Sequence, residues 1–369
     1  MRSPLYRALS VVPLVILVFL AACSQQAASP TATPTTKPAA TPTTGAATTP
    51  ATGAAASPTK AATPAGPAKE LKIGVIGPLS GAAATWGQAL ERGIILAAED
   101  FNKKGGVTVG GERYMIKVIS YDDKYTGDGG VTAATRLVTE DKVKFIFGPI
   151  SSASVLALQS ITEPAGVLVL PDTYSPEVVG PNKPFTVRVT ATSNEIAPVM
   201  YQWLKKAYPD YKKVASLEPN DVTGQNVGRH HKEAAKAVGL EIVADEYYER
   251  GTTDFYPVLT KMLAKNPDVL DGGALPTADI ALVMKQAREL GYKGFLMASG
   301  GQDAETLYKL GGEAVVGTVS PYAPIDDPRY PKVQEVVNKY KARWTEAFNT
   351  IVLAFYDPAV PWYSNQIFD

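Results

Sequence analysis

Short apolar runs alternate with amphipathic stretches along most of the chain after residue 68. The stretch 145–174, FIFGPISSASVLALQSITEPAGVLVLPDTY, shows this unit most clearly. It predicts a buried strand over Lys144–Phe147, a turn at Gly148-Pro149, a helix, and a second buried strand over Val167–Leu170. Apolar runs without polar alternation are typical of strands covered on both faces, which are parallel and joined by a helical crossover. The pattern therefore predicts an α/β fold.

The same order of elements recurs before and after this stretch. Further strands are predicted over Leu71–Ile76, Tyr114–Tyr121, Lys213–Leu217, Leu240–Ala244, Val269–Leu270 and Gly294–Ala298. Helices are predicted from Thr85 onward and over Thr132–Leu137, Thr223–Val238, Phe255–Ala264, Ala278–Leu290 and Tyr330–Phe348, with another starting at Ile351–Tyr356. Two βα runs of like order predict two doubly wound parallel-sheet lobes. Extended pieces near Val187–Thr190 and Thr318–Tyr322 are the predicted hinge crossings between them.

The first predicted helix carries two local signals. Thr85 and Gln88 have the spacing of a capping box. One helical face is lined by Leu90, Ile94, Ala97, Ala98 and Phe101. We therefore expect Thr85 to cap the helix and this face to be buried.

Polar side chains gather where two neighbouring buried strands end. Ser151, Ser152 and Ser154 come where the first strand meets its helix, and the segment 172–174 leaves the second strand. A helix N-terminus offers unpaired N–H groups and a partial positive charge, and serine hydroxyls add donors. Because the carboxyl ends of parallel strands share one edge, both loops face one crevice. The sequence thus predicts a small-molecule site that suits a carboxylate or another anion.

Composition excludes several classes of function. Acidic and basic residues balance at 36 each among 369 residues, so nothing indicates a nucleic-acid partner. The 45% hydrophobic content supports a sizeable core, and the length suits two domains. The glycine pairs are predicted turns, and the sequence has no phosphate loop and no zinc spacing. We expect no cofactor and no bound metal.

The two histidines, His230 and His231, are neighbours on a predicted helix. Neighbours on a helix point about 100° apart, so the pair lacks the i, i+4 spacing that shares one metal. We expect both to be solvated surface residues. Neither is placed as a general base beside Ser151, which disfavours a secreted hydrolase using Ser151 or Ser152. The sequence predicts no enzyme.

The front of the chain has the build of a secretory leader. Arg2 and Arg7 precede an apolar run over Val11–Ala22 that is short for a membrane span. The run ends in Leu-Ala-Ala-Cys at Cys23, which resembles the lipobox of bacterial lipoproteins. That resemblance implies cleavage before Cys23 and diacylation of its thiol, although a chance cysteine behind an ordinary signal is the alternative. The segment 24–68, almost wholly Ala, Thr, Pro, Ser and Gly, is predicted to be a disordered tether that holds the body near a membrane.

Several motifs of the body together resemble one protein family. They are IGPLSGAAATWGQALERGIILAAEDFNKKGG, SYDD at Ser120–Asp123, KFIFGPISSAS and VLVLPDTYSPEVV, in this order. They resemble the substrate-binding lipoproteins of branched-chain amino acid ABC importers, and the likeness covers Leu71 to about Tyr322. The resemblance implies a type I periplasmic binding protein fold with three crossover strands, closure on a small ligand, and the importer's permease subunits as partners.

The resemblance also implies ligand-binding residues in the first lobe. Trp86 matches an aromatic residue against the ligand, with a core residue as the alternative. Ile150, Ser151 and Ser152 match the segment that receives the ligand carboxylate, although serines at a helix start are often only caps. The segment Asp172, Thr173 and Tyr174 matches one that usually has small residues and a hydroxyl. Asp172 departs from the pattern: it would repel a nearby carboxylate, pair with a cationic ligand group, or simply cap the next turn.

From the second lobe, Thr223, Ala274 and the loop 300–303 match ligand-facing positions. Thr223 replaces what is often a tyrosine, and the acidic residue that holds an α-ammonium aligns near Gly300. Either Asp303 takes that role or the ligand has no α-amino group. We therefore expect an amino acid, an amide or a carboxylate as the ligand.

The resemblance implies a five-part organisation. Residues 1–22 are a signal peptide, 23–68 the lipidated cysteine with its tether, 69–188 the first part of lobe 1, and 189–319 lobe 2. Residues 320–369 are a hinge crossing and a return to lobe 1, shortened because similar proteins continue for roughly fifty residues more. The implied function is an extracytoplasmic receptor for an importer. An extracellular sensing module of a signalling system is the alternative, because it would have the same fold.

Overall fold

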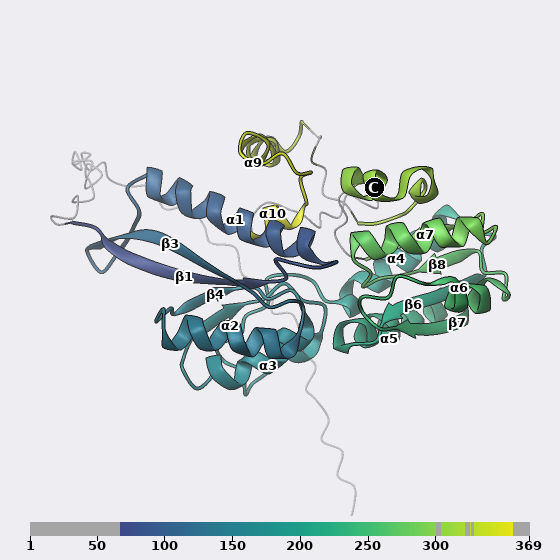
Figure 1. The fold of residues 1–369 in the computed structure, drawn as a ribbon, viewed down its shortest axis with the longest axis horizontal. Coiled ribbons are helices and arrows are strands. Elements are labelled where there is room, and N and C mark those ends of the chain that lie inside the picture. The colour runs from purple at the N-terminus through teal and green to yellow at the C-terminus, as the bar shows by residue number, and fades with distance from the viewer. Residues whose placement is uncertain (1–66, 300–303, 322–324, 326–327, 357–369) are drawn as a thin grey trace, which may run out of the picture. The chain divides into compact units, whose positions relative to one another are not determined.

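The computed structural model describes residues 67–299, 304–321, 325 and 328–356. Two β-sheets, each covered by helices on both faces, make up this part of the chain (Figure 1). We call the first sheet with its helices the first lobe and the second sheet with its helices the second lobe. Within the described residues, none of the helices combines the length and apolar character needed to cross a membrane.

The first lobe contains a five-stranded sheet in the order β2-β3-β1-β4-β5. Its strands are β1 (Lys69–Gly77), β2 (Val107–Val109), β3 (Glu112–Asp122), β4 (Phe145–Phe147) and β5 (Leu168–Leu170). All pairs are parallel except β2 with β3, which is antiparallel. The parallel sheet was predicted from the apolar runs, whereas the hairpin that adds β2 was not.

Helices pack on both faces of this sheet. Helix α1 (Ala84–Lys103) covers one face, and α2 (Gly127–Thr139) and α3 (Ser152–Thr162) cover the other (Figure 1). Val75 of β1 packs in the apolar cluster that includes α1, whereas Ile76 packs in the cluster of α2 and α3. Successive residues of one strand thus face opposite layers, which explains why the strand reads as a continuous apolar run.

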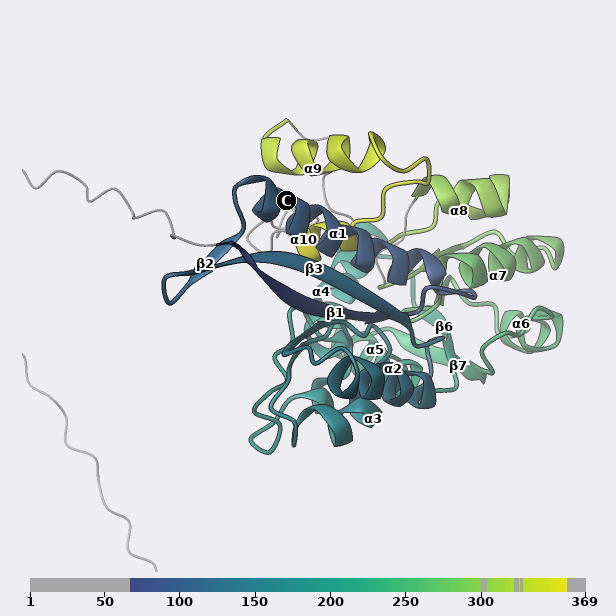
Figure 2. The ribbon, with the colours of Figure 1, turned by 60° about the vertical axis from the view of Figure 1, so that its left-hand side comes forward.

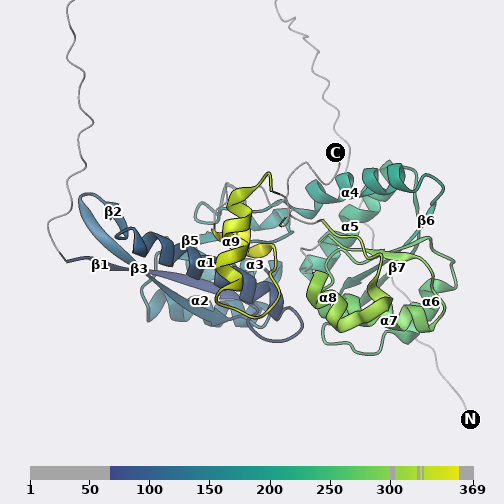
Figure 3. The same cartoon turned by 90° about the horizontal axis from the view of Figure 1, so that it is seen from above.

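The second lobe repeats this plan with a four-stranded, wholly parallel sheet in the order β7-β6-β8-β9. Its strands are β6 (Lys213–Pro219), β7 (Glu241–Tyr248), β8 (Val269–Asp271) and β9 (Phe295–Met297). Helices α4 (Ser193–Ala207) and α5 (Val222–Ala237) lie on one face, and α6 (Tyr256–Leu263) and α7 (Thr277–Glu289) on the other (Figure 3). The predicted fold class of two doubly wound lobes is confirmed.

The chain returns to the first lobe near its described end. After α8 (Ala304–Gly311), helices α9 (Pro331–Lys341) and α10 (Ile351–Tyr356) pack beside α1 (Figure 2). The predicted helix over Tyr330–Phe348 is shorter than expected, because it ends at Lys341. Arg92 of α1 donates to the Tyr340 hydroxyl at 2.6 Å, which ties α9 to the first lobe.

Two extended segments continue the edges of the sheets. Thr186 forms a parallel bridge with Val169 of β5, and Val319 forms one with Met297 of β9. These segments overlap the predicted crossings, of which Tyr322 lies outside the described residues. Each segment thus pairs with an edge strand of its sheet, β5 in the first lobe and β9 in the second.

Two local predictions about α1 are wrong. The helix begins at Ala84, with Ala83 as its N-cap and no side-chain cap, so Thr85 lies inside the first turn instead of capping it. Phe101 is 50% exposed because the buried face ends at Ala98. The helix ends at Lys103 with Lys104 as its C-cap, and Gly105 and Gly106 follow with φ angles of 97° and 85° that favour glycine.

Candidate functional site

The loop between β4 and α3 begins with a backbone conformation that requires glycine. Gly148 has a φ of 81°, and a Cβ atom there would lie 2.0 Å from the carbonyl oxygen of Ile76. Ser151 then caps α3, because its Oγ accepts a hydrogen bond from the Ser154 amide at 3.3 Å. The Ser151 hydroxyl also donates to the Tyr125 carbonyl at 3.4 Å. Ser151 therefore caps α3, which is one of the two roles that the sequence left open for it.

Ser152 brings three predicted residues together. Its hydroxyl shares a 2.5 Å hydrogen bond with Thr173 Oγ1, and its amide donates to Thr223 Oγ1 at 3.2 Å. Ser152 is fully buried, and Thr173 and Thr223 are each 2% exposed. Because Thr223 belongs to α5 of the second lobe, the strand-end loops of the two lobes are in direct contact at this point.

Asp172 and Tyr174 continue this edge of the first lobe. The Asp172 amide donates to the Pro149 carbonyl at 3.1 Å, which ties the loop after β5 to the loop after β4. Burial raises the pKa of the Asp172 carboxyl to about 7. The Tyr174 hydroxyl donates to the Ser299 carbonyl of the second lobe at 3.0 Å. Ser175, not Asp172, caps the following 3-10 turn.

Trp86 is buried beside this group. It is 4% exposed and shares an apolar cluster with Ile150 and Tyr125. Its ring centroid lies 6.2 Å from that of Tyr125. The indole Nε1 is buried and, within residues 67–299, 304–321, 325 and 328–356, has no hydrogen-bond partner. Trp86 is thus a core residue of the first lobe that also presents an unpaired donor.

The SYDD segment holds the neighbouring loops in place. Asp122 accepts hydrogen bonds from the Leu79 and Lys124 amides at 2.9 and 2.8 Å and from the Ser80 hydroxyl at 2.5 Å. Burial alone would raise the pKa of Asp122, but these hydrogen bonds outweigh it and lower the pKa. The next residues, Lys124 and Tyr125, have φ angles of 53° and 62°, which non-glycine residues seldom adopt. The segment therefore fixes an unusual backbone that positions the Tyr125 ring.

The second lobe contributes a buried carboxylate that sequence reasoning missed. Both oxygens of Glu218, at the end of β6, accept backbone hydrogen bonds: from Gly273 at 2.7 Å and from Ala274 at 2.9 Å. This arrangement positions the predicted Ala274, which is 1% exposed. Burial, together with the nearby Asp271 carboxylate, raises the pKa of Glu218 well above its ordinary value. The predicted Asp303 lies outside the described residues.

The expected surface position of the histidines is wrong. His231 is fully buried and His230 is 7% exposed, because α5 packs against both the sheet and α4. His230 Nδ1 lies 2.6 Å from Ser193 Oγ, and His231 Nδ1 lies 2.7 Å from Asp271 Oδ2. The Tyr201 hydroxyl donates to the same Asp271 oxygen at 2.6 Å. Each histidine thus pairs with an inward-facing partner.

Glu218, His231 and Asp271 form a group whose potential ligand atoms lie within 4.8 Å of one another. Carboxylate and imidazole groups at such spacing resemble a metal centre. Both Glu218 oxygens, however, already accept amide hydrogen bonds, and His231 Nδ1 is paired with Asp271. The group is therefore best described as a buried polar network beneath the Gly273–Ala274 loop.

Sequence reasoning also missed Arg250. The strand β7 runs to Tyr248, four residues beyond the predicted end at Ala244, so Arg250 follows the carboxyl end of a parallel strand. Its Nε donates to Asp221 Oδ2 at 2.5 Å, and its guanidinium carbon lies 4.2 Å from the Tyr125 ring centroid. Recognising the longer strand would have placed Arg250 among the strand-end residues.

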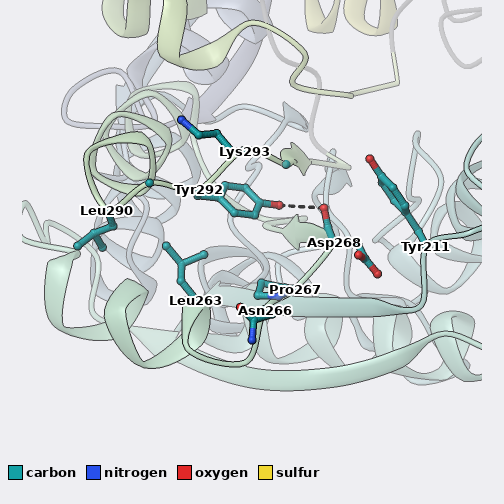
Figure 4. A pocket seen from close by; sticks show the side chains of 10 residues that line it. Tyr211, Leu263, Asn266, Pro267, Asp268, Leu290, Tyr292 and Lys293 are labelled. Carbon is teal, nitrogen blue, oxygen red and sulfur yellow. Dashed lines mark hydrogen bonds between the residues drawn. The ribbon is translucent and has the colours of Figure 1, made fainter.

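A pocket of about 560 Å³ lies at the other edge of the second sheet, near the amino ends of β8 and β9 (Figure 4). Tyr211, Asp268 and Tyr292 line it, and the Tyr292 hydroxyl donates to the Asp268 carbonyl at 3.2 Å. None of the predicted site residues that the structure describes lines this pocket. In parallel α/β sheets, ligands gather at the carboxyl ends of the strands, so the group around Ser152 is the candidate site.

A family model described as "Periplasmic binding protein" matches residues 70–359 of this chain. A Pseudomonas aeruginosa relative named "Leucine-, isoleucine-, valine-, threonine-, and alanine-binding protein" is 26% identical over 291 residues, which is 78% of this chain and 76% of the relative. A second Pseudomonas aeruginosa relative, named "Amino acid binding protein", is 29% identical over 277 residues, covering 74% of this chain and 72% of the relative.

Two solved structures share the fold. One is a solute-binding protein of an ABC transporter from Rhodopseudomonas palustris BisB5 in complex with 3,4-dihydroxy benzoic acid, with a TM-score of 0.67, 26% identity, and coverage of 79% of this chain and 78% of the other. The other is a branched-chain amino acid transporter substrate binding protein from Streptococcus pneumoniae in complex with isoleucine, with a TM-score of 0.69, 22% identity, and coverage of 80% and 85%. With its two parallel-sheet lobes and a family match over most of its length, this chain belongs to the periplasmic binding protein family, whose members are solute-binding proteins and not enzymes.

Proposed function

We propose that this protein is the extracytoplasmic receptor of an ABC importer and that it binds a small carboxylate- or amide-bearing ligand between its lobes. The observation that carries the proposal is the contact of Ser152 in the first lobe with Thr223 in the second. Loops at the carboxyl ends of parallel strands are where α/β sheets bind ligands. Lobes that meet through such loops can open and close around a ligand as a hinge.

The first lobe would hold the ligand's carboxylate or amide oxygen. The Ser152 amide lies in the first turn of α3, where helix N–H groups are unpaired within the helix and favour negative charge. The hydroxyls of Ser152 and Thr173 lie beside it. Asp172, with a pKa of about 7, is largely protonated below neutral pH and would not repel a carboxylate there.

The second lobe would close over the ligand's body. The residues that we propose as ligand-binding are those of the two facing edges: Trp86, Ile150, Ser151, Ser152, Asp172, Thr173, Tyr174, Thr223, Ala274 and Asp303. The apolar ones, Trp86 and Ile150, would cover the ligand's hydrocarbon part, since they share one cluster.

Importer function is favoured over sensing because the relatives with solved structures are described as transporter substrate-binding proteins. Their bound ligands, isoleucine and 3,4-dihydroxy benzoic acid, both carry a carboxylate. That shared group supports a carboxylate as the feature that the first lobe would recognise. The ligand's remaining part would be set by the second lobe.

The leader and the tether would place the receptor at a membrane. The apolar run over Val11–Ala22 and the cysteine at position 23 support a cleaved signal peptide and an acylated Cys23. Residues 24–68 would then link the anchor to the lobes. Replacing Cys23 with Ser should move the protein from the membrane fraction to the soluble extracytoplasmic fraction. Retention of the variant in the membrane fraction would refute the lipid anchor.

A thermal-shift screen of the purified protein tests the proposed function. The panel contains leucine, isoleucine, benzoate, 3,4-dihydroxybenzoate, 4-methylpentanoate, succinate and benzamide. A ligand that binds only the folded state raises the melting temperature as its concentration rises above Kd. We expect at least one carboxylate to do so, with saturable binding by calorimetry and no chemical change in the ligand. A panel without any shift, or turnover of the ligand, would refute the proposal.

A further inference from the structure

Arg250 reaches from one lobe to the other. It follows β7 at the carboxyl edge of the second sheet, and its guanidinium carbon lies 4.2 Å from the ring centroid of Tyr125 in the first lobe. A cation at this distance over an aromatic ring is attracted by the ring's electrons. Arg250 is thus a cation held at the place where the strand-end loops of both lobes meet.

The hydrogen bonds of Arg250 are incomplete. A guanidinium has five N–H donors, and within the described part of the chain the Nε donor alone is paired, with Asp221. Both Nη1 and Nη2 are buried and have no hydrogen-bond partner among the residues that the structure describes. A buried donor without an acceptor carries its full desolvation cost, and more so when the group is charged. The two terminal nitrogens of Arg250 therefore need acceptors that the neighbouring side chains do not provide.

The surroundings of Tyr125 contain one more unpaired donor and one unpaired acceptor. Trp86, whose ring also packs near Tyr125, has a buried and unpaired Nε1. Asp123, on the same loop as Tyr125, has an unpaired Oδ2, but this oxygen makes no hydrogen bond to Arg250. The corner around Tyr125 thus presents donors that an acceptor-rich, negatively charged group would satisfy.

Arg250 and the proposed anion position converge on this corner. Asp221, which pairs with Arg250, caps α5 through the Gly224 amide at 2.9 Å. Thr223, two residues after Asp221, is the residue that contacts the Ser152 amide. The Arg250 fork and the first turn of α3 therefore approach the same corner from the two lobes.

We propose that Arg250 is a specificity-determining residue that clamps the ligand's carboxylate from the second lobe, which makes the receptor selective for small organic acids that lack an α-amino group. The inference rests on the proposed function. Two parallel N–H···O bonds from Nη1 and Nη2 match a carboxylate, which the Ser152 amide holds from the other side. An α-ammonium close to Arg250 would be repelled, whereas a neutral amide would lack the ion pair.

Matched ligand pairs test the proposal by calorimetry. Benzoate is compared with benzamide, and 4-methylpentanoate with leucine, which has the same skeleton plus an amino group. In at least one of the two ligand pairs, we expect the unaltered protein to bind the acid at least about tenfold more tightly than the amide or the amino acid. A charge-assisted, bidentate hydrogen bond from Arg250 to the carboxylate implies this difference. Arg250→Gln should remove this preference, mainly by lowering the affinity for the acid. Arg250→Lys should retain part of the preference.

The control is Arg229→Gln. Arg229 lies on α5 and faces Glu177 of the first lobe at 3.8 Å, but its side chain is 52% exposed. Its loss changes net charge equally and should leave the acid preference unchanged. Because the preference is a ratio measured within one variant, partial unfolding of Arg250→Gln does not mask it, and Arg250→Lys serves if that variant does not fold.

Two results overturn the inference while leaving the proposed receptor function intact. One is a receptor that shows no preference for the acid in either pair, or that binds no acid of the two pairs. The other is an Arg250→Gln variant that keeps the acid preference. A variant that binds the acid and its matched partner equally more weakly counts as this result, since Arg250 would then act only as a contact between the lobes. Failure of every ligand in the thermal-shift panel would instead refute the proposed function itself.

Discussion

The Ser152 amide donates a hydrogen bond to Thr223 Oγ1 at 3.2 Å, which joins the first turn of α3 in one lobe to the first turn of α5 in the other. First-turn amides have no acceptor inside their own helix. This donor is therefore one that a ligand oxygen can take when the lobes part. Under the proposed function, the Thr223 hydroxyl occupies the position of a ligand acceptor.

Replacing Ser152 with Ala should weaken carboxylate binding by about 5- to 30-fold, because one hydrogen bond to a charged group and its bond to Thr173 are lost. Ser160→Ala is the matched control, since Ser160 lies on the same helix, is exposed, and among the described residues donates its hydroxyl only to the Ala157 carbonyl. Calorimetric titration with the best carboxylate of the panel measures both. Equal affinity in the two variants would remove the Ser152 hydroxyl from the site.

Trp86→Ala should lower the free energy of unfolding by about 3–5 kcal/mol, because the 4% exposed side chain fills a core cluster. Alanine therefore cannot separate ligand contact from packing. Trp86→Phe keeps most of the buried area and removes the unpaired Nε1. We expect the free energy of unfolding of Trp86→Phe, measured in urea, to lie within about 1.5 kcal/mol of that of the unaltered protein. We expect its affinity for the carboxylate to fall severalfold. Unchanged affinity would make Trp86 a core residue alone.

Asp172 should make stability depend on pH. An ordinary aspartate has a pKa of about 3.9, and burial raises the pKa of Asp172 to about 7. Between these values the folded state binds more protons than the unfolded state, so the free energy of unfolding decreases as pH rises from about 4 to about 7. The three-unit difference corresponds to at most about 4 kcal/mol.

Urea unfolding at pH 4.5 and pH 8 measures this effect. Asp172→Asn should lose less stability between the two pH values than the unaltered protein does, whereas the exposed Asp210→Asn should behave like the unaltered protein. Asp123, whose pKa burial raises to about 6, contributes in the same direction in every variant. Identical pH dependence in Asp172→Asn and the unaltered protein would contradict the buried, raised-pKa description.

Asp271→Ala should destabilise the second lobe by about 2–4 kcal/mol, because His231 and the Tyr201 hydroxyl both lose their buried partner. Asp271→Asn retains an acceptor oxygen and should cost less. Denaturant unfolding measures both variants. If Asp271→Ala changes the free energy of unfolding by less than about 0.5 kcal/mol, the network around His231 does not contribute to stability.

The sequence predicted the parts of the fold that depend on apolar runs and turn residues. The strand–helix–strand unit around Gly148 and Ser151 was expected because its strands are buried on both faces and its turn needs glycine. The same reasoning found the second lobe. Helix α4 was missed, although Thr192 and Glu195 form a capping box at its start.

The failures share a physical reason, which is that tertiary contacts override local pattern. The edge strand β7 alternates polar and apolar residues, so its end was placed before Arg250. Helix α5 is rich in small and polar residues, yet it is buried between the sheet and α4, which conceals His230 and His231. Thr85 has capping spacing, but the helix starts one residue before it, at Ala84.

A crystal structure of the protein grown with the tightest carboxylate from the panel tests the central claim most directly. We expect the carboxylate within hydrogen-bond distance of the Ser152 amide, displacing Thr223 Oγ1, with residues of both lobes around the ligand. A ligand bound elsewhere, such as the pocket beside Tyr292, with the Ser152–Thr223 hydrogen bond intact, would contradict the account.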